Sequence, residues 1–217
     1  VDVADESGHA ASAAEARRVL AGIAGELGDK GLARASFEAA IDIARAHGDE
    51  AGRARLLREF SSLLLALGAT SEAEARLSES MALAERVGDK FLRLDARTTL
   101  GIAMVARGAY DDALELLTVA CAELRDHGLT ARAVGAYNAL GVIHSRRRDI
   151  LAAEAVFAEA LDLTESAPRR VQLQHNLAMA RLRVGRPRAA LALLLSILPQ
   201  REAMASGRGL AFAHSSI

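Results

Sequence analysis

The chain has 217 residues, of which 51% are hydrophobic and only 3% aromatic, and its formal net charge is −1. This charge gives no electrostatic reason to expect nucleic acid or an anionic membrane as a partner. The sequence has no uncharged apolar run of about 18 residues, the length that spans a membrane. The one cysteine, Cys121, excludes an intramolecular disulfide and fits a reducing compartment, so we expect a cytoplasmic protein.

Taken in order, residues 1–12 are small and polar, and we expect them to form a lead-in segment. The chain starts without Met and without a signal-peptide pattern, which indicates a piece of a longer protein. Apolar residues at spacings of three and four then predict helices near 13–27, 31–47, 50–67 and 71–87. Ser71 with Glu74 predicts a capping box at the start of the last of these.

Two columns of turn residues continue this pattern along the chain with a period of 40. The first column runs through Gly28, Gly68 and Gly108 to Arg148, and reaches Gly185 after a shorter step; the second comprises Gly48, Gly88, Gly128 and Pro168. A helical repeat of this length is typical of a solenoid. We therefore predict an all-α fold, with repeats at 13–48, 50–88, 90–128, 130–167 and 168–207, and the start of a sixth repeat at 208–217.

Packing positions recur with the same period in the second helix of each repeat. They are occupied by Ala, a large apolar residue and a small residue, as in Ala113, Leu117 and Ala120. In the first helices, Gly101 and Gly141 stand at one repeat position, where a glycine in mid-helix costs about 1 kcal/mol. We expect close contact between helices to offset this cost.

These residues resemble the tetratricopeptide repeat over residues 13–207. The family's pattern appears as Leu100, Gly101, Gly108, Tyr110, Ala113, Leu117 and Ala120. The resemblance implies a right-handed α-solenoid of about five antiparallel helix pairs. The 40-residue period is similar to that of the arrays in MalT-like and LuxR-type regulators and in signalling ATPases, whereas most family members repeat every 34 residues. The glycine position of the fourth repeat departs from the pattern because it is occupied by Arg148.

The sequence contains no phosphate-binding glycine loop, no metal-spaced Cys/His cluster and no nucleophile elbow. His47 precedes a glycine that ends a helix, where it favourably meets the helix dipole. Asp111 and Asp112 fall in the first turn of a predicted helix. The helix dipole favours negative charge there, so these residues need no catalytic role to explain them. We therefore predict no enzyme activity, no metal site and no cofactor.

One set of polar residues recurs where the family binds partners. In tetratricopeptide arrays the first helices line the concave face, and the position ten residues before the turn glycine points into the groove. This column comprises Arg18, Arg58, Thr98, Asn138 and His175, and Asn176 and Arg183 extend it. Such donors are suited to holding a peptide backbone or a carboxylate. A solvated face that is polar for solubility alone is an equally good interpretation.

Two classes of function remain open. The first is an interaction or sensor module that binds a protein or peptide segment in the concave groove, within a larger bacterial signalling or transcription-regulatory protein. The alternative is a structural scaffold or self-association module that uses the convex face. We also expect the C-terminal end, with Leu210, Ala211 and Phe212, to expose an apolar face that self-associates or frays.

Overall fold

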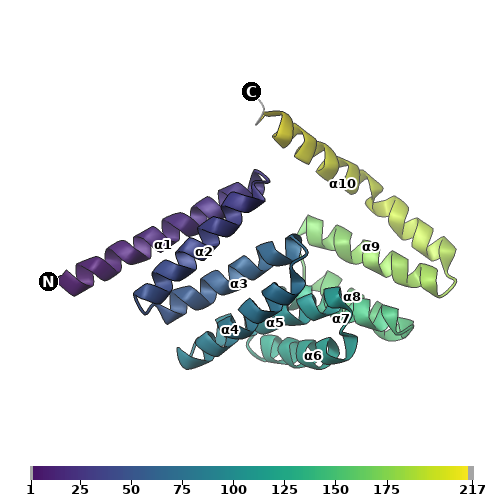
Figure 1. Ribbon diagram of the computed structural model, residues 1–217. Helices are drawn as coiled ribbons and strands as arrows, with labels where there is room; N and C mark the ends of the chain where they lie inside the picture. Colours follow the sequence, from purple (N-terminus) through teal and green to yellow (C-terminus); the bar gives the residue numbers. More distant parts are fainter. Residues whose placement is uncertain (1, 215–217) are drawn as a thin grey trace. The chain divides into compact units, whose positions relative to one another are not determined.

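The computed structural model describes residues 2–214, and the side chains of residues 9–129 and 132–203. Within residues 2–214 the chain forms helices and no strands, as the periodicity predicts. The helices are α1 (Asp2–Glu26), α2 (Lys30–Ala46), α3 (Glu50–Ala66), α4 (Thr70–Arg86), α5 (Lys90–Arg107), α6 (Tyr110–Asp126), α7 (Thr130–Arg146), α8 (Ile150–Asp162), α9 (Ala167–Arg183) and α10 (Pro187–His214). Figure 1 shows them as successive hairpins.

The chain divides into two compact units, Val1–Glu123 and Leu124–Ile217. In the first unit α1 pairs with α2 and α3 with α4, and the first helices also contact one another, α1 with α3 and α3 with α5. In the second unit α7 pairs with α8 and α9 with α10, and α7 contacts α9. Each unit therefore has one side formed by its first helices, which we call the first-helix face.

The turns between helices confirm both glycine columns. Positive φ angles of 69° to 91° occur at Gly28, Gly48, Gly68, Gly88, Gly108, Gly128 and Gly185. In the turn at Gly48 the next amide, that of Asp49, donates to the carbonyl of Ala44 at 2.9 Å, which closes the helix as a Schellman motif does. Arg148 takes the same left-handed conformation, with φ 63°, although a side chain makes it costly.

An aspartate follows several of these turns and caps the next helix, a signal that the sequence analysis did not use. The carboxylates of Asp29, Asp49, Asp89 and Asp149 each accept from the backbone amide three residues later. The capping box predicted at Ser71 is wrong, because α4 begins at Thr70 after Ala69, which offers no side-chain cap. Ser71 therefore lies inside the helix rather than at its N-cap.

The packing positions form the cores of the two units. Ala33, Ala73, Ala113, Ala153 and Ala190 are at most 2% exposed. Gly101 lies against Leu117, and Gly141 against Phe157: a Cβ built on either glycine would come within 2.6 Å of the facing side chain. The close helix contact predicted at both glycines is confirmed, because any side chain there would overlap its neighbour.

Both ends of the chain are more helical than the sequence analysis expects. Helix α1 begins at Asp2 and takes in the predicted lead-in, because its alanines favour a helix and Ala10 and Ala14 are buried. Helix α10 continues through Pro199 and across the boundary predicted between the fifth repeat and the sixth at residues 207 and 208, since strong helix formers flank both positions. The exposed apolar face predicted at Leu210, Ala211 and Phe212 lies outside the residues whose side chains the structure describes.

The fourth repeat also ends earlier than its column predicts. Helix α8 stops at Asp162, and Pro168 lies in the first turn of α9, where its missing N–H has no helical partner to lose. Pro168 therefore starts a helix instead of ending one. Among the described helices, none has the length and apolar character needed to cross a membrane.

Candidate functional site

The predicted site residues all come from the first helices, but they divide between the two units. Arg18, Arg58 and Thr98 belong to α1, α3 and α5 of the first unit. The remaining residues, Asn138, His175, Asn176 and Arg183, belong to α7 and α9 of the second unit. Each unit thus contributes its own group, and a groove common to both stays a prediction.

In the first unit, Arg18 is already neutralised by two glutamates. Its guanidinium donates to both carboxylate oxygens of Glu15 at 2.6 and 2.7 Å, and to Glu59 Oε2 at 3.3 Å. Hydrogen bonding to Glu15, and then to Glu59, raises the pKa of Arg18, and hydrogen bonding to Arg18 lowers the pKa of Glu15. Most of the donors of Arg18 are therefore used within the protein.

Arg58 makes fewer and longer contacts with carboxylates than Arg18 does. Its closest carboxylate is Glu59, whose Oε1 lies 3.5 Å from a guanidinium nitrogen. Glu59 is shared with Arg18, so it compensates only part of the charge. The side chain of Arg58 is 29% exposed, which leaves it accessible to a ligand.

Thr98 differs from the other members of the column because it is buried. Only 8% of the residue is exposed, and within the described residues its hydroxyl has no hydrogen-bond partner. Its side chain is short, and the neighbouring helices cover it. Thr98 thus contributes to packing between helices, in contrast to the exposed polar role expected from its column.

In the second unit, side-chain amides join α7 to α9. Asn176 Nδ2 donates to Asn138 Oδ1 at 2.8 Å, and Gln172 Nε2 donates to Asn176 Oδ1 at 3.2 Å. Both asparagines are half-buried. Among the described side chains no acceptor faces the amino group of Asn138, so this group can donate to a ligand.

The other two residues of the second group bind neighbouring side chains. Arg201 donates to His175 Nδ1 across 3.1 Å, and this requires a neutral ring with its proton on Nε2, because a guanidinium only donates. Arg183 donates to the hydroxyl of Ser145 at 3.2 Å. Ser145 is buried, so this bond fixes Arg183 against α7.

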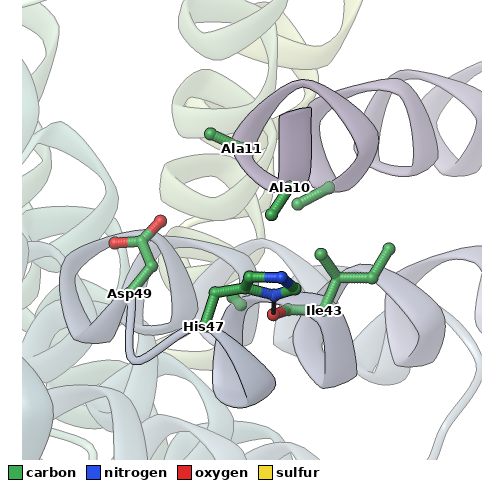
Figure 2. A pocket seen from close by; sticks show the side chains of 7 residues that line it. Ala10, Ala11, Ile43, His47 and Asp49 are labelled. Atoms are coloured by element: carbon green, nitrogen blue, oxygen red, sulfur yellow. Dashed lines mark hydrogen bonds between the residues drawn. The ribbon is translucent and has the colours of Figure 1, made fainter. Parts of the chain in front are cut away.

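Two adjoining hollows lie between α1 and the helices α2 and α3, and the sequence analysis missed them. One, of about 170 Å³, is lined by Ala10, Ala11, Ala14, Ile43, Ala44, His47 and Asp49. The other, of about 210 Å³, shares Ala11, Ala14 and Asp49 and reaches Arg18 and Glu59. Figure 2 shows the His47 ring below Ala10, where Nδ1 donates to the carbonyl of Ile43 at 2.9 Å. His47 thus caps its helix as predicted.

Gly52, in the first turn of α3, lines the second of these hollows. The same repeat position on α5 is occupied by Leu92, which is only 6% exposed and belongs to the core. A Cβ at Gly52 would overlap the Asp49 carboxylate, at 2.1 Å from Oδ2. Gly52 therefore leaves room for the Asp49 carboxylate, which caps α3.

Comparison with known proteins finds one family model that matches a part of the chain and many solved structures with a similar fold. The sequence model of the tetratricopeptide repeat matches residues 14–47. Those residues therefore form a tetratricopeptide repeat. The rest of the chain has the fold of an array of such repeats, as similar solved structures show. No curated protein sequence matches the chain.

Three similar structures illustrate the fold. BtubC from P. vanneervenii is 17% identical, with 94% of this chain and 93% of that chain covered and a TM-score of 0.71. A putative kinesin light chain from Podosopora anserina with TPR-like repeats is 19% identical, with coverages of 91% and 98% and a TM-score of 0.71. The Rap conjugation gene regulator of plasmid pLS20, in complex with the Phr* peptide, is 18% identical, with coverages of 86% and 53% and a TM-score of 0.73.

At these identities the likeness establishes the fold alone. The tetratricopeptide resemblance and the all-α repeat fold are thus confirmed, and this fold typically serves as a non-enzymatic scaffold for protein interactions. The finer resemblance to MalT-like and LuxR-type arrays stays a prediction.

Proposed function

We propose that the chain is a protein-interaction module that binds an extended peptide segment on its first-helix face. In this proposal it has no enzyme activity and works in the cytoplasm, as part of a larger bacterial signalling or transcription-regulatory protein. The binding residues are the predicted column without the buried Thr98: Arg18, Arg58, Asn138, His175, Asn176 and Arg183. The observation that carries the proposal is the amide pair of Asn138 and Asn176.

The amide pair has the chemistry that a peptide main chain requires. A side-chain amide offers one acceptor and two donors, so it can bond the N–H and the C=O of an extended segment. The bond between Asn138 and Asn176 holds both groups in place before a ligand arrives. This reduces the side-chain entropy that binding would otherwise cost.

The first unit supports the proposal with Arg58, which has only one long contact with a carboxylate, and with a hollow. Arg58 can donate to a carboxylate or a carbonyl of the segment, because its contact with Glu59 at 3.5 Å is loose. The hollow beside Gly52 has an apolar part formed by Ala11, Ala14 and Leu56 and a charged rim that includes Glu15, Asp49, Arg55 and Glu59, which suits a small side chain with a polar end. Arg18 is held in place by Glu15 and Glu59, so it offers the segment only the donors that these two carboxylates leave.

One structural neighbour supports a peptide as the class of partner. The Rap conjugation gene regulator was solved in complex with the Phr* peptide. Its fold is similar to that of this chain over 86% of the chain, although the chain covers only 53% of the regulator. A peptide partner is therefore the first class to test.

The test is selection of peptides from a random displayed library on the intact chain, followed by titration of a selected peptide. Asn138→Ala and Arg58→Ala should each weaken binding at least tenfold, which corresponds to about 1.4 kcal/mol. Gln200→Ala and Arg45→Ala, which alter exposed residues on second helices, are the matched controls. Added salt should weaken the Arg58 contribution in particular.

Equal affinities for the wild type and the two first-helix variants would refute the proposal. Binding that is lost only in the second-helix variants would instead favour the convex-face scaffold. Far-UV circular dichroism of each variant checks that helicity is unchanged.

A further inference from the structure

The net charge of −1 conceals opposite charges in the two units. Residues 1–123 contain 14 Lys and Arg against 21 Asp and Glu, a formal charge of −7. Residues 124–217 contain 13 Arg and no Lys against 7 Asp and Glu, a formal charge of +6. The second unit by itself is therefore basic, and all its lasting positive charge comes from arginines.

Most of this excess lies at one edge of the second unit, where two turns come together. Arg183, at the end of α9, donates to Ser145 Oγ near the end of α7 at 3.2 Å. Arg181 donates to Glu154 Oε1, in the first turns of α8, at 2.9 Å. The turn between α7 and α8 thus lies beside the turn between α9 and α10. The segments 146–148 and 181–188 contain seven arginines between them, and we call this surface the arginine edge.

The carboxylates at the arginine edge are already in use. Glu154 is shared by two guanidinium groups, those of Arg181 at 2.9 Å and Arg186 at 3.2 Å. Asp149 caps α8 by accepting from the amide of Ala152 at 3.2 Å. Two carboxylates therefore face seven arginines, and neither of them can neutralise a further cation without giving up a contact.

Three arginines of this edge keep an uncompensated charge. Arg146, Arg148 and Arg188 are all exposed. Within the part of the chain whose side chains are described, none of the three makes an ion pair with a carboxylate. Their guanidinium groups are therefore available to a ligand.

The fold itself does not require these arginines. The equivalent turns of the first unit, residues 26–28, 66–68 and 106–108, contain one arginine and one glutamate among nine residues. They close the same kind of turn with glycine at the position of Arg148. A cation at the end of a helix favourably meets the helix dipole, but the first unit shows that the turn forms without three of them. A role in binding explains the arginines better than a role in the turn.

The surroundings of the arginine edge favour a protein over a nucleic acid as its partner. Leu151, in the first turn of α8, is 75% exposed, and Val184, between α9 and α10, is 38% exposed. Arginine beside apolar side chains is suited to a protein interface. Single-stranded nucleic acid is instead bound by stacking its bases on exposed aromatic rings. The described aromatic side chains of the second unit, Tyr137 and Phe157, are buried.

We propose that the arginine edge binds an acidic segment of a partner protein. Aspartate or glutamate side chains of the segment pair with Arg146, Arg148 and Arg188, since the planar guanidinium matches a carboxylate with two parallel N–H donors. Apolar side chains of the segment contact Leu151 and Val184. This site lies on the turns of the second unit, so it does not depend on peptide binding at the amide pair.

The test is a fluorescence-anisotropy titration of the intact chain with three labelled probes. They are a flexible peptide of glutamate, leucine and glycine, the same peptide with glutamine in place of glutamate, and an oligothymidylate of the same net charge as the first peptide. The glutamate peptide should bind, and its affinity should fall as salt is added. The glutamine peptide should bind about tenfold more weakly or less.

Two substitutions locate the binding at the arginine edge. Arg148→Gly and Arg188→Gln should each weaken binding of the glutamate peptide about fivefold. Arg148→Gly is the more informative of the two, because glycine adopts the φ of 63° without steric cost. A loss of affinity in this variant therefore does not come from a less stable fold, which thermal unfolding verifies.

The matched control is Arg169→Gln, which removes the same charge from an exposed arginine at the start of α9, the opposite end of that helix. It should bind the glutamate peptide like the wild type. Equal weakening in Arg169→Gln would overturn the proposal, because it would indicate a general effect of net charge. A glutamate peptide that fails to bind, that binds no better than the glutamine peptide, or that is unaffected by both edge substitutions would also overturn it. Tighter binding of the oligothymidylate would assign the edge to nucleic acid instead.

Discussion

The sharpest test of the packing is a single methyl group added at Gly141. A Cβ at this position would lie 2.5, 2.6 and 2.8 Å from three ring carbons of Phe157. Ordinary contacts between carbon atoms are about 3.5 to 4.0 Å. The ring must therefore move away by about 1 Å, but Phe157 is completely buried, and protein cores are close-packed.

Two opposing free energies determine the stability of Gly141→Ala. Overpacking a core typically costs about 1 to 3 kcal/mol, and overlap with three atoms of a rigid ring places this site in the upper half of that range. Replacing glycine by alanine inside a helix stabilises the helix by about 1 kcal/mol. The net loss in the free energy of unfolding should thus be about 1 to 2 kcal/mol, which for a chain of this size lowers Tm by roughly 2 to 8 °C.

Gly22→Ala separates the two contributions. Gly22 lies inside α1, and a Cβ there has no atom within 4 Å. This variant should gain the helix-propensity term alone, about 1 kcal/mol. The difference between the two variants in urea denaturation, monitored by circular dichroism, then measures the overlap with Phe157. If Gly141→Ala were as stable as Gly22→Ala, the close approach of α7 and α8 at this glycine would be refuted.

Two further predictions concern a turn and an exposed ion pair. Arg148→Gly should raise the free energy of unfolding by about 1 kcal/mol, because Arg148 has φ 63° and glycine adopts this conformation without steric cost; an unchanged Tm would contradict the strain. Hydrogen bonding to Arg18 lowers the pKa of Glu15 in the folded chain. Its stabilisation should be present above the ordinary carboxyl pKa of 4.5 and lost as the pH falls through the lowered value. Glu15→Gln should flatten this part of the profile of Tm against pH, and a profile identical to that of the wild type would show that the pair contributes nothing.

The turns and cores could be predicted from the sequence because each depends only on the residues of one turn or one helix. A glycine that ends a helix needs only its own backbone to adopt a positive φ, so Gly28 and Gly48 mark their turns wherever the repeats lie. Ala33 and its equivalents are set by the spacing along one helix. The bounds of α1 and α10 were harder to predict, because no turn residue of the two columns marks where α1 starts or α10 stops, and helix-forming residues carry α1 back to Asp2 and α10 through Gly207.

The candidate site could be predicted only in part, because its properties come from residues in the next repeat. The column that contains Arg18 predicts a polar first-helix face, but the charge of Arg18 is compensated by Glu59, which stands one column away and one repeat later. The bond between Asn138 and Asn176 has the same origin, since Asn176 also occupies the neighbouring column of the next repeat. Within each unit consecutive first helices are in contact, so side chains in adjacent columns of successive repeats meet. Comparing adjacent columns across one repeat would therefore have predicted both interactions: that Arg18 is neutralised, and that Asn138 and Asn176 form a prearranged amide pair.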